Sequence, residues 1–231
     1  MRARTAATLS AMDEADEAGE EAVMTLPDGY SEEARTLWGA AVALNRRAGA
    51  VSLPPLLFFT DPDRTPRPWE TAARLPAGAG VVFRAFGRPD AIETGRRLRE
   101  ATRAAGVRLL VGLDVDLAEG IEADGLHLPE RATDRAGAIR DAHPDWLLTA
   151  AWHGEGRPPA DALDALILSP VFPAGGASAD KPALGVERFA ARAADAGLPV
   201  YALGGVTPGN AMSLSNACGL AGVDAVQAAF R

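Results

Sequence analysis

Cysteine, lysine and long apolar runs are scarce in this chain of 231 residues, and each shortage excludes a class of protein. The single cysteine, Cys218, can neither form an intrachain disulfide nor supply the ligands of a zinc ribbon. The sequence has no stretch of about 18 uninterrupted apolar residues, so we expect no membrane span. Hydrophobic residues still make up 48% of the chain and charged residues 23%, which is typical of a folded domain and excludes a collagen-like or wholly disordered chain.

Acidic residues outnumber basic ones, and the excess lies near the N-terminus. The formal charge is −8, and the first 33 residues contain nine acidic residues against Arg2 and Arg4. An acidic balance argues against nucleic acid as a partner. Because this segment has many like charges and no sustained apolar period, residues 1–30 are predicted to form a flexible acidic arm. The acidic run and the missing apolar core also argue against a targeting peptide and favour a cytoplasmic protein.

A helix is predicted directly after this arm. Ser31 can cap its N-terminus, two acidic residues follow in the first turn, and apolar residues recur at helical spacing over Leu37–Leu44. Gly49 is a typical residue at which a helix stops. The domain predicted over residues 31–231 therefore begins with a helical extension over residues 31–50.

Short apolar runs alternate with amphipathic stretches from Leu56 onwards. Several runs are continuous, as expected for parallel strands that are buried on both faces. Eight such strands, each followed by a segment of helical length, predict an α/β fold, a closed (β/α)8 TIM barrel with an extra N-terminal helix. An open doubly wound sheet is the alternative, but no glycine fingerprint for a dinucleotide follows an early strand. The predicted strands are Leu56–Thr60, Gly80–Arg84, Arg108–Gly112, Gly125–Leu128, Trp146–Ala150, Ala165–Ser169, Pro199–Leu203 and Ala225–Ala228, and the predicted helices include Ala91–Ala105, Glu187–Ala196 and Pro208–Gly219.

The catalytic residues of such a barrel lie where the strands end. Three runs at these ends, residues 123–128 (Ala-Asp-Gly-Leu-His-Leu), 169–173 (Ser-Pro-Val-Phe-Pro) and 202–206 (Ala-Leu-Gly-Gly-Val), resemble the strand 4, 6 and 7 motifs of the thiamine phosphate synthase and thiazole tautomerase (TenI-like) superfamily. The resemblance extends over residues 56–231 and implies a small barrel that binds a thiazole phosphate. One branch of this superfamily couples hydroxymethylpyrimidine pyrophosphate to thiazole phosphate with magnesium. The other branch aromatises a thiazole carboxylate phosphate without metal.

A phosphate site is predicted at the end of the seventh strand. The run Gly204–Pro208 ends a strand and opens a helix, where glycine lets the backbone approach closely and free N–H groups face an anion. The alternative is that the glycines serve only the turn. By resemblance, the backbone after strand 8 and the loop after strand 6 complete the pocket. The candidate phosphate- and substrate-binding residues are Gly204, Gly205, Val206, Ala229, Phe230, Ala174, Gly176, Lys181, Ala151 and His127.

The magnesium ligands of the synthase branch are not retained at their expected positions. By resemblance, the two aspartates fall on Leu113 and Ala132. Asp114, Glu130 and Asp134 lie near enough in sequence to act as substitutes, but nothing in the spacing requires this role. We therefore expect no bound metal and no required cofactor, and magnesium only if the chain is an active synthase.

Two cationic side chains are candidates for contacts with the ligand. Arg84 is the retained member of a Gln-x-Arg-x-Lys pattern, and its guanidinium suits phosphate oxygens, so it is predicted to be catalytic. Phe86 stands where that pattern has its lysine. Lys181, the only lysine, either contacts a pyrophosphate or is a solvated charge of the loop.

His153 is the second predicted catalytic residue. By resemblance it occupies the place of the histidine that moves protons in the tautomerase branch, while Ala151 replaces a serine of the family. Imidazole suits proton transfer because it titrates near neutral pH, although a histidine that only shapes the pocket is the alternative. His127 stands in an apolar strand and has a structural interpretation beside its candidacy for the pocket, and His143 is assigned to a loop.

Three functions are compatible with these patterns. Metal-free proton transfer of the thiazole tautomerase type is favoured, because the magnesium aspartates are missing. A divergent magnesium-dependent thiamine phosphate synthase and a non-catalytic barrel that binds a phosphorylated ligand are the alternatives. The expected partners are small phosphorylated thiazole or pyrimidine substrates, with no nucleic acid and no membrane, and a homo-oligomer is left open.

Overall fold

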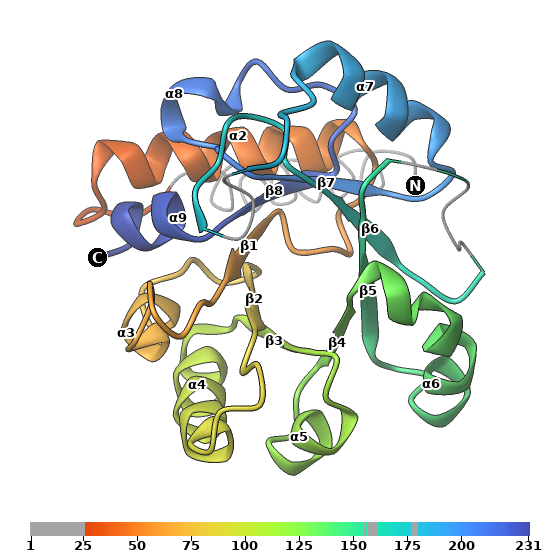
Figure 1. Cartoon of the computed structure of the whole chain (residues 1–231). Coiled ribbons are helices and arrows are strands. Elements are labelled where there is room, and N and C mark those ends of the chain that lie inside the picture. Colours follow the sequence, from red (N-terminus) through yellow and green to blue (C-terminus); the bar gives the residue numbers. More distant parts are fainter. Residues whose placement is uncertain (1–25, 155, 157–160, 177–179) are drawn as a thin grey trace, which may run out of the picture.

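The computed structural model describes residues 26–154, 156, 161–176 and 180–231. Within them, eight parallel strands close a barrel in which each strand pairs with the next and the eighth pairs with the first (Figure 1). The prediction of a (β/α)8 barrel is therefore confirmed, while the predicted acidic arm falls almost entirely outside the described residues. The strands are β1 (Leu56–Phe59), β2 (Gly80–Phe83), β3 (Arg108–Gly112), β4 (Gly125–Leu128), β5 (Leu147–Trp152), β6 (Ala165–Leu168), β7 (Val200–Leu203) and β8 (Gly219–Gly222).

The predicted position of the eighth strand is wrong. The sequence predicts it at Ala225–Ala228, but this segment lies in helix α9 (Asp224–Ala229), which follows β8. The run Gly-Leu-Ala-Gly that forms β8 has no β-branched or aromatic residue, so its strand character is not visible in the pattern. The same error lengthens the preceding helix, because Pro208–Gly219 is predicted and α8 spans only Pro208–Ala211.

The helices that surround the barrel differ widely in length. Figure 1 shows them outside the ring of strands, with α8 and α9 as two of the shorter ones. No helix of the described residues is long and apolar enough to cross a membrane. The remaining helices are α2 (Glu32–Arg47), α3 (Pro68–Ala72), α4 (Ala91–Ala105), α5 (Val115–Gly120), the 3-10 helix η1 (Glu130–Arg135), α6 (Ala136–Ala142) and α7 (Val186–Asp195).

Helix α2 covers the side of the barrel where α8 and α9 are short. It begins directly after Ser31, as predicted, and the Ser31 hydroxyl accepts a hydrogen bond from the backbone N–H of Ala34 at 3.1 Å. The helix packs against α8, α9 and β8, and it buries Trp38 there. The buried Asn45 amide donates to the carbonyls of Ala50 (2.9 Å) and Cys218 (3.0 Å), which ties the end of α2 to the start of β8.

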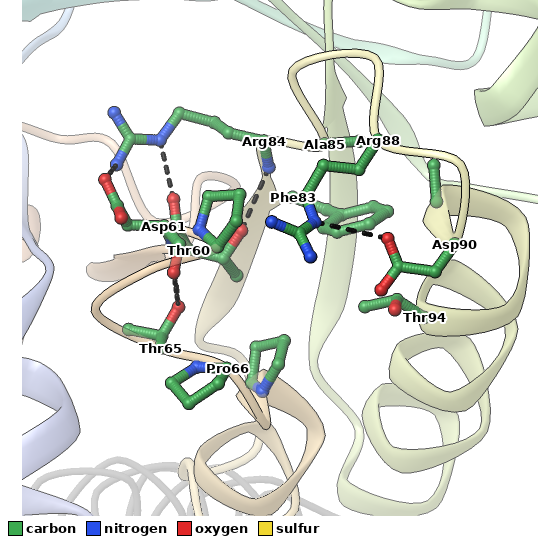
Figure 2. A pocket seen from close by; sticks show the side chains of 13 residues that line it. Thr60, Asp61, Thr65, Pro66, Phe83, Arg84, Ala85, Arg88, Asp90 and Thr94 are labelled. Atoms are coloured by element: carbon green, nitrogen blue, oxygen red, sulfur yellow. Dashed lines mark hydrogen bonds and ion pairs between the residues drawn. The ribbon is translucent and has the colours of Figure 1, made fainter.

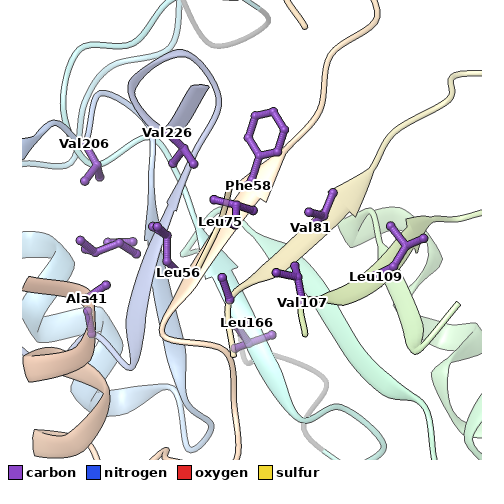
Figure 3. Close-up of a cluster of buried hydrophobic side chains, with 14 of the residues drawn as sticks. Ala41, Leu56, Phe58, Leu75, Val81, Val107, Leu109, Leu166, Val206 and Val226 are labelled. Atoms are coloured by element: carbon purple, nitrogen blue, oxygen red, sulfur yellow. The ribbon is translucent and has the colours of Figure 1, made fainter. Parts of the chain in front are cut away.

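Side chains that alternate along each strand form two separate apolar layers. The outer layer lies between the strands and the helices, and Figure 3 shows Leu56 and Phe58 of β1 in this layer with Val226 of α9. The inner layer fills the barrel with side chains such as Phe59, Val82, Leu110, Ile167 and Tyr201. Because the interior is filled, a ligand has room only at an end of the barrel, and active sites of this fold lie at the C-terminal ends of the strands.

Candidate functional site

Side chains along each strand point alternately into and out of the barrel, and this alternation also determines which side chains lie at its mouth. Two residues beyond the buried Val82, the strand direction brings Arg84 to the inner face. Side chains alternate in the same way along β5, so Leu147, Ala151 and His153 share the inner face. His153 lies just beyond the last residue of the strand. Arg84, Ala151 and His153, three of the predicted site residues, are therefore all on the inner side at the same end of the barrel.

Arg84 is held firmly against the end of β1. Its backbone N–H donates to the Thr60 hydroxyl at 3.0 Å, and its Nε donates to the Thr60 carbonyl at 2.7 Å. Its Nη2 lies 3.7 Å from an Asp61 carboxylate oxygen, as Figure 2 shows. The guanidinium carbon also lies 5.5 Å from the ring centroid of Phe59 and 5.4 Å from that of Phe86. Burial lowers the pKa of Arg84, and the Asp61 carboxylate opposes this shift while nearby Arg64 adds to it.

Arg84 and Asp61 lie between two cavities. The smaller one, about 100 Å³ and drawn in Figure 2, lies between the loops that follow β1 and β2. The larger one, about 400 Å³, opens beside the ends of β7 and β8 and includes the predicted residues Gly204, Gly205, Val206 and Ala174. Its other lining residues are Asp61, Arg64, Arg84, Pro173, Gly175, Leu203, Thr207, Gly222, Val223, Asp224, Ala225 and Ala228.

The glycine pair after β7 is required by backbone geometry. Gly204 and Gly205 have φ values of +96° and +64°, which favour glycine. A Cβ on Gly205 would lie 2.4 Å from the carbonyl oxygen of Pro173, so the loop after β6 packs directly onto this glycine. The turn interpretation of the glycines is thus correct for the fold, and the cavity beside them leaves the phosphate interpretation as a prediction.

The turn after β8 differs from the prediction, because that strand ends at Gly222. Ala229 and Phe230 are predicted to follow the strand, but they lie at the far end of α9 and do not line the large cavity. The Ala229 carbonyl instead accepts a hydrogen bond from Ser31 at 3.2 Å, and Phe230 is buried with its ring against Tyr30. Their assignment to the phosphate turn is therefore wrong, and Val223 and Asp224 occupy that turn.

His153 contacts two charged side chains at the mouth. Its Nδ1 lies 2.5 Å from Oε2 of Glu130, and its backbone N–H donates to Oε1 of the same carboxylate at 3.2 Å. Its Nε2 lies 3.2 Å from Nζ of Lys181. The three residues come from the ends of β4 and β5 and from the loop after β6, and Arg192 of α7 donates to the His153 carbonyl at 3.2 Å.

This arrangement selects one form of the imidazole. An ionised carboxylate only accepts hydrogen bonds, so Nδ1 of His153 carries a proton toward Glu130. An ammonium group only donates, so Nε2 presents its lone pair to Lys181. The ring is therefore held in the tautomer whose Nε2 can accept a proton, and Glu130 can stabilise the imidazolium that forms.

His127 lies deeper, in the wall of the barrel. Its Nδ1 is 3.0 Å from the Thr149 hydroxyl, and its ring packs edge-on to Phe59 with 5.1 Å between ring centroids. Burial lowers the pKa of His127 to about 3, and the charge of Arg84 adds to the shift. A neutral, packed ring fits the structural interpretation of this residue.

Two of the acidic side chains near the expected magnesium positions are engaged within the protein. Leu113 and Ala132 have no oxygen ligands to offer, and Oδ1 of Asp114 accepts the backbone N–H of Leu117 at 2.9 Å as the cap of α5. Glu130 is engaged by His153. Among the residues that the structure describes, no three His, Cys, Asp or Glu side chains are grouped so that they could hold a metal ion.

These features define a (β/α)8-barrel protein whose candidate site combines an arginine-lined cavity with a carboxylate–histidine pair. Residues 61–229 match the family model described as thiamine monophosphate synthase, and the chain belongs to this family. The resemblance seen in the strand 4, 6 and 7 motifs is therefore confirmed.

Individual relatives agree with this assignment. The thiamine-phosphate synthase of Methylobacillus flagellatus is 32% identical over 190 residues, which cover 76% of this chain and 87% of the relative. The thiamine biosynthesis bifunctional protein ThiM/ThiE of Symbiobacterium thermophilum is 37% identical over 149 residues, which cover 61% of this chain and 30% of the relative. The chain also spans 65% of the length of a relative from Geobacter sulfurreducens. The thiamine phosphate pyrophosphorylase of Pyrococcus furiosus shares the fold, with a TM-score of 0.63, 23% identity and coverage of 76% of this chain and 91% of that one.

Sequence reasoning missed Arg64 and Asp224 at the large cavity. Arg64 follows Asp61 by three residues, so its place in the loop after a strand was a usable signal. Asp224 is not predicted as a site residue, because the sequence places the eighth strand at Ala225–Ala228, directly after it. Gly176, a predicted residue of the ligand pocket, lies against Arg64, whose Nη1 would be 2.6 Å from a Cβ at that position.

Proposed function

We propose that this protein catalyses metal-independent proton transfer on a phosphorylated thiazole, in the manner of the thiazole tautomerase branch of its family. The observation that carries the proposal is the pairing of His153 Nδ1 with the Glu130 carboxylate at 2.5 Å, which favours the tautomer whose Nε2 can act as a base once Lys181 has moved away from it. The magnesium-dependent coupling reaction fits less well, because Leu113 and Ala132 have no carboxylate and one oxygen of Asp114 already caps α5.

The phosphate group of the substrate would bind in the large cavity. Gly205 and Val223 line this space, and Arg64 and Arg84 line it from the loops after β1 and β2. Two guanidinium groups can bind phosphate oxygens through paired hydrogen bonds. The thiazole ring would then extend across the mouth toward His153.

The proposed chemistry breaks one C–H bond and forms another, so the composition of the substrate does not change. Nε2 of His153 takes a proton from the non-aromatic thiazole ring, and the Glu130 carboxylate stabilises the resulting imidazolium. His153 then returns the proton at a second atom of the conjugated system, which leaves the ring aromatic. Lys181, 3.2 Å from Nε2, would move to the substrate carboxylate and thereby release the lone pair of His153.

A binding titration tests this proposal before any turnover is measured. The purified protein is titrated with thiazole phosphate and with hydroxymethylpyrimidine pyrophosphate, each in the presence and absence of magnesium. We expect thiazole phosphate to bind equally well with and without magnesium, because its phosphate site consists of backbone groups and arginines. Tight binding of the pyrimidine pyrophosphate that requires magnesium would contradict the proposal and favour a divergent synthase.

A matched pair of variants separates catalysis from binding. His153→Gln keeps a hydrogen-bonding side chain but cannot act as a base near neutral pH, so it should retain affinity for thiazole phosphate and lose turnover of the thiazole carboxylate phosphate. His143→Gln is the control, because His143 stacks on Trp146 at the end of α6 and lies away from the mouth. Binding without turnover in the unmodified protein would favour a non-catalytic barrel.

A further inference from the structure

Arg64, one of the two arginines proposed to bind the phosphate group, is already paired with Asp224 at the large cavity. Nε of Arg64 donates to Oδ1 of Asp224 at 2.9 Å, and its Nη2 donates to the second carboxylate oxygen, so the contact is bidentate. Both residues line the cavity next to Gly205 and Val223. The Asp224 carboxylate therefore holds the arginine in the way that two oxygens of a phosphate would.

The two partners of this pair differ in how firmly they are fixed. The backbone N–H of Arg64 donates to Asp61 at 3.2 Å, and its guanidinium lies against Gly176, so the loops after β1 and β6 enclose it. The side chain of Asp224 is 62% exposed, against 28% for Arg64. An ion pair with so exposed a partner is broken easily, because the released carboxylate is solvated by water.

Charge balance at the cavity leads to the same conclusion. Two arginines, Arg64 and Arg84, face two carboxylates, Asp224 and Asp61, so these four groups have no net charge. A phosphate dianion that enters this neutral group meets the carboxylate of Asp224 at the turn where it would bind. It gains the guanidinium of Arg64 as a partner only when that carboxylate leaves Arg64.

We infer that Asp224 is an internal competitor for the phosphate site, and that a phosphorylated ligand binds by taking Arg64 from Asp224. Arg64 is then a ligand of the phosphate group, and Asp224 sets how tightly phosphate monoesters are held. The inference deepens the proposed function at its phosphate subsite, and it requires only a phosphate group on the ligand, whatever the rest of the molecule is.

The test measures dissociation constants of inorganic phosphate and of thiazole phosphate by calorimetry, for the full chain and its variants. Removing the competitor with Asp224→Asn should tighten binding of both probes about five- to tenfold, and Arg64→Ala should weaken it about tenfold or more. In the double variant the gain from Asp224→Asn should shrink, because there is no arginine left to release. Far-ultraviolet circular dichroism and a thermal melt establish that each variant is folded.

Two control variants carry the same charge changes outside the cavity. Asp63→Asn removes an exposed carboxylate from the same loop as Arg64, and Arg67→Ala removes an arginine that pairs with Glu70. Both should leave the dissociation constants within about twofold, as expected for screened surface charges. If Asp224→Asn binds phosphate no more tightly than the unmodified protein, or if Arg64→Ala binds it equally well, the competition is refuted.

The two probes distinguish this inference from the proposed function. If inorganic phosphate follows the expected pattern while thiazole phosphate binds no better than phosphate alone, the competition between Asp224 and phosphate is supported and the proposed substrate is wrong. If thiazole phosphate binds tightly and Asp224→Asn leaves both dissociation constants unchanged, the proposed substrate is supported and the competition is wrong.

Discussion

The buried imidazole of His127 should make the protein less stable as the pH falls below neutrality. Its pKa is about 3 in the folded protein and about 6.5 in an unfolded chain, so between these values the unfolded state binds a proton that the folded state does not. The stability that comes from keeping His127 neutral is therefore fully present above pH 6.5 and is lost as the pH falls toward 3. From these two pKa values, the free energy of unfolding should fall by about 2 kcal/mol between pH 7.5 and pH 5.0 on account of this group alone.

The contribution is isolated by comparing the unmodified protein with His127→Gln. Glutamine does not titrate and can still form a hydrogen bond with Thr149, although some packing against Phe59 is lost. Urea unfolding at pH 7.5, 6.5 and 5.0 gives both free-energy profiles, and the carboxylates common to both proteins cancel in the difference. The unmodified protein should lose about 2 kcal/mol more than the variant over this range. Parallel profiles would show that His127 is not kept neutral by burial.

Four further variants test the catalytic pair, the glycine turn and the attachment of α2. His153→Gln should lower kcat by about 100- to 10,000-fold and Glu130→Gln by a smaller factor, with KM nearly unchanged in both; equal activity in steady-state assays would remove the pair from the mechanism. Gly205→Ala should lower the melting temperature and weaken phosphate binding, because φ is +64° and the new Cβ would meet the Pro173 carbonyl oxygen at 2.4 Å; an unchanged melt would contradict this packing. Asn45→Ala should cost about 2 kcal/mol in urea unfolding, since buried carbonyls lose their donor, and a change below about 0.5 kcal/mol would refute that role.

The fold was predictable from the sequence wherever the strands were apolar and bounded by turn residues. Leu56–Phe59 and Ala165–Leu168 are continuous apolar runs, and such runs are typical of parallel strands buried on both faces. The run Gly219–Gly222 consists of glycine, alanine and leucine, without a β-branched or aromatic residue, so its strand character is not recognisable from sequence. The apolar residues that follow it are compatible with either a strand or a helix. That single misplacement moved the predicted phosphate turn from Val223 to Ala229.

The members of the candidate site were predictable individually, but their contacts were not. The sequence offers Glu130 as a substitute metal ligand and Lys181 as a contact for pyrophosphate, whereas both side chains contact His153 in the structure. Glu130 and Lys181 are separated from His153 by 23 and 28 positions along the chain, respectively. Their contacts with it depend on how three loops fold over the mouth. Strand periodicity predicts which residues reach the mouth, and it contains no information about the conformation of the loops beyond it.

The central claim is that the chemistry depends on His153 and not on magnesium, and one assay compares the two directly. Thiamine phosphate formation from hydroxymethylpyrimidine pyrophosphate and thiazole phosphate is measured with excess magnesium and again after EDTA, beside turnover of the thiazole carboxylate phosphate under both conditions. We expect no coupling above background, and we expect turnover of the thiazole substrate to survive EDTA and to be lost in His153→Gln. Brisk coupling that requires magnesium would contradict it, and would mean that Asp114, Glu130 or Asp134 holds the metal after all.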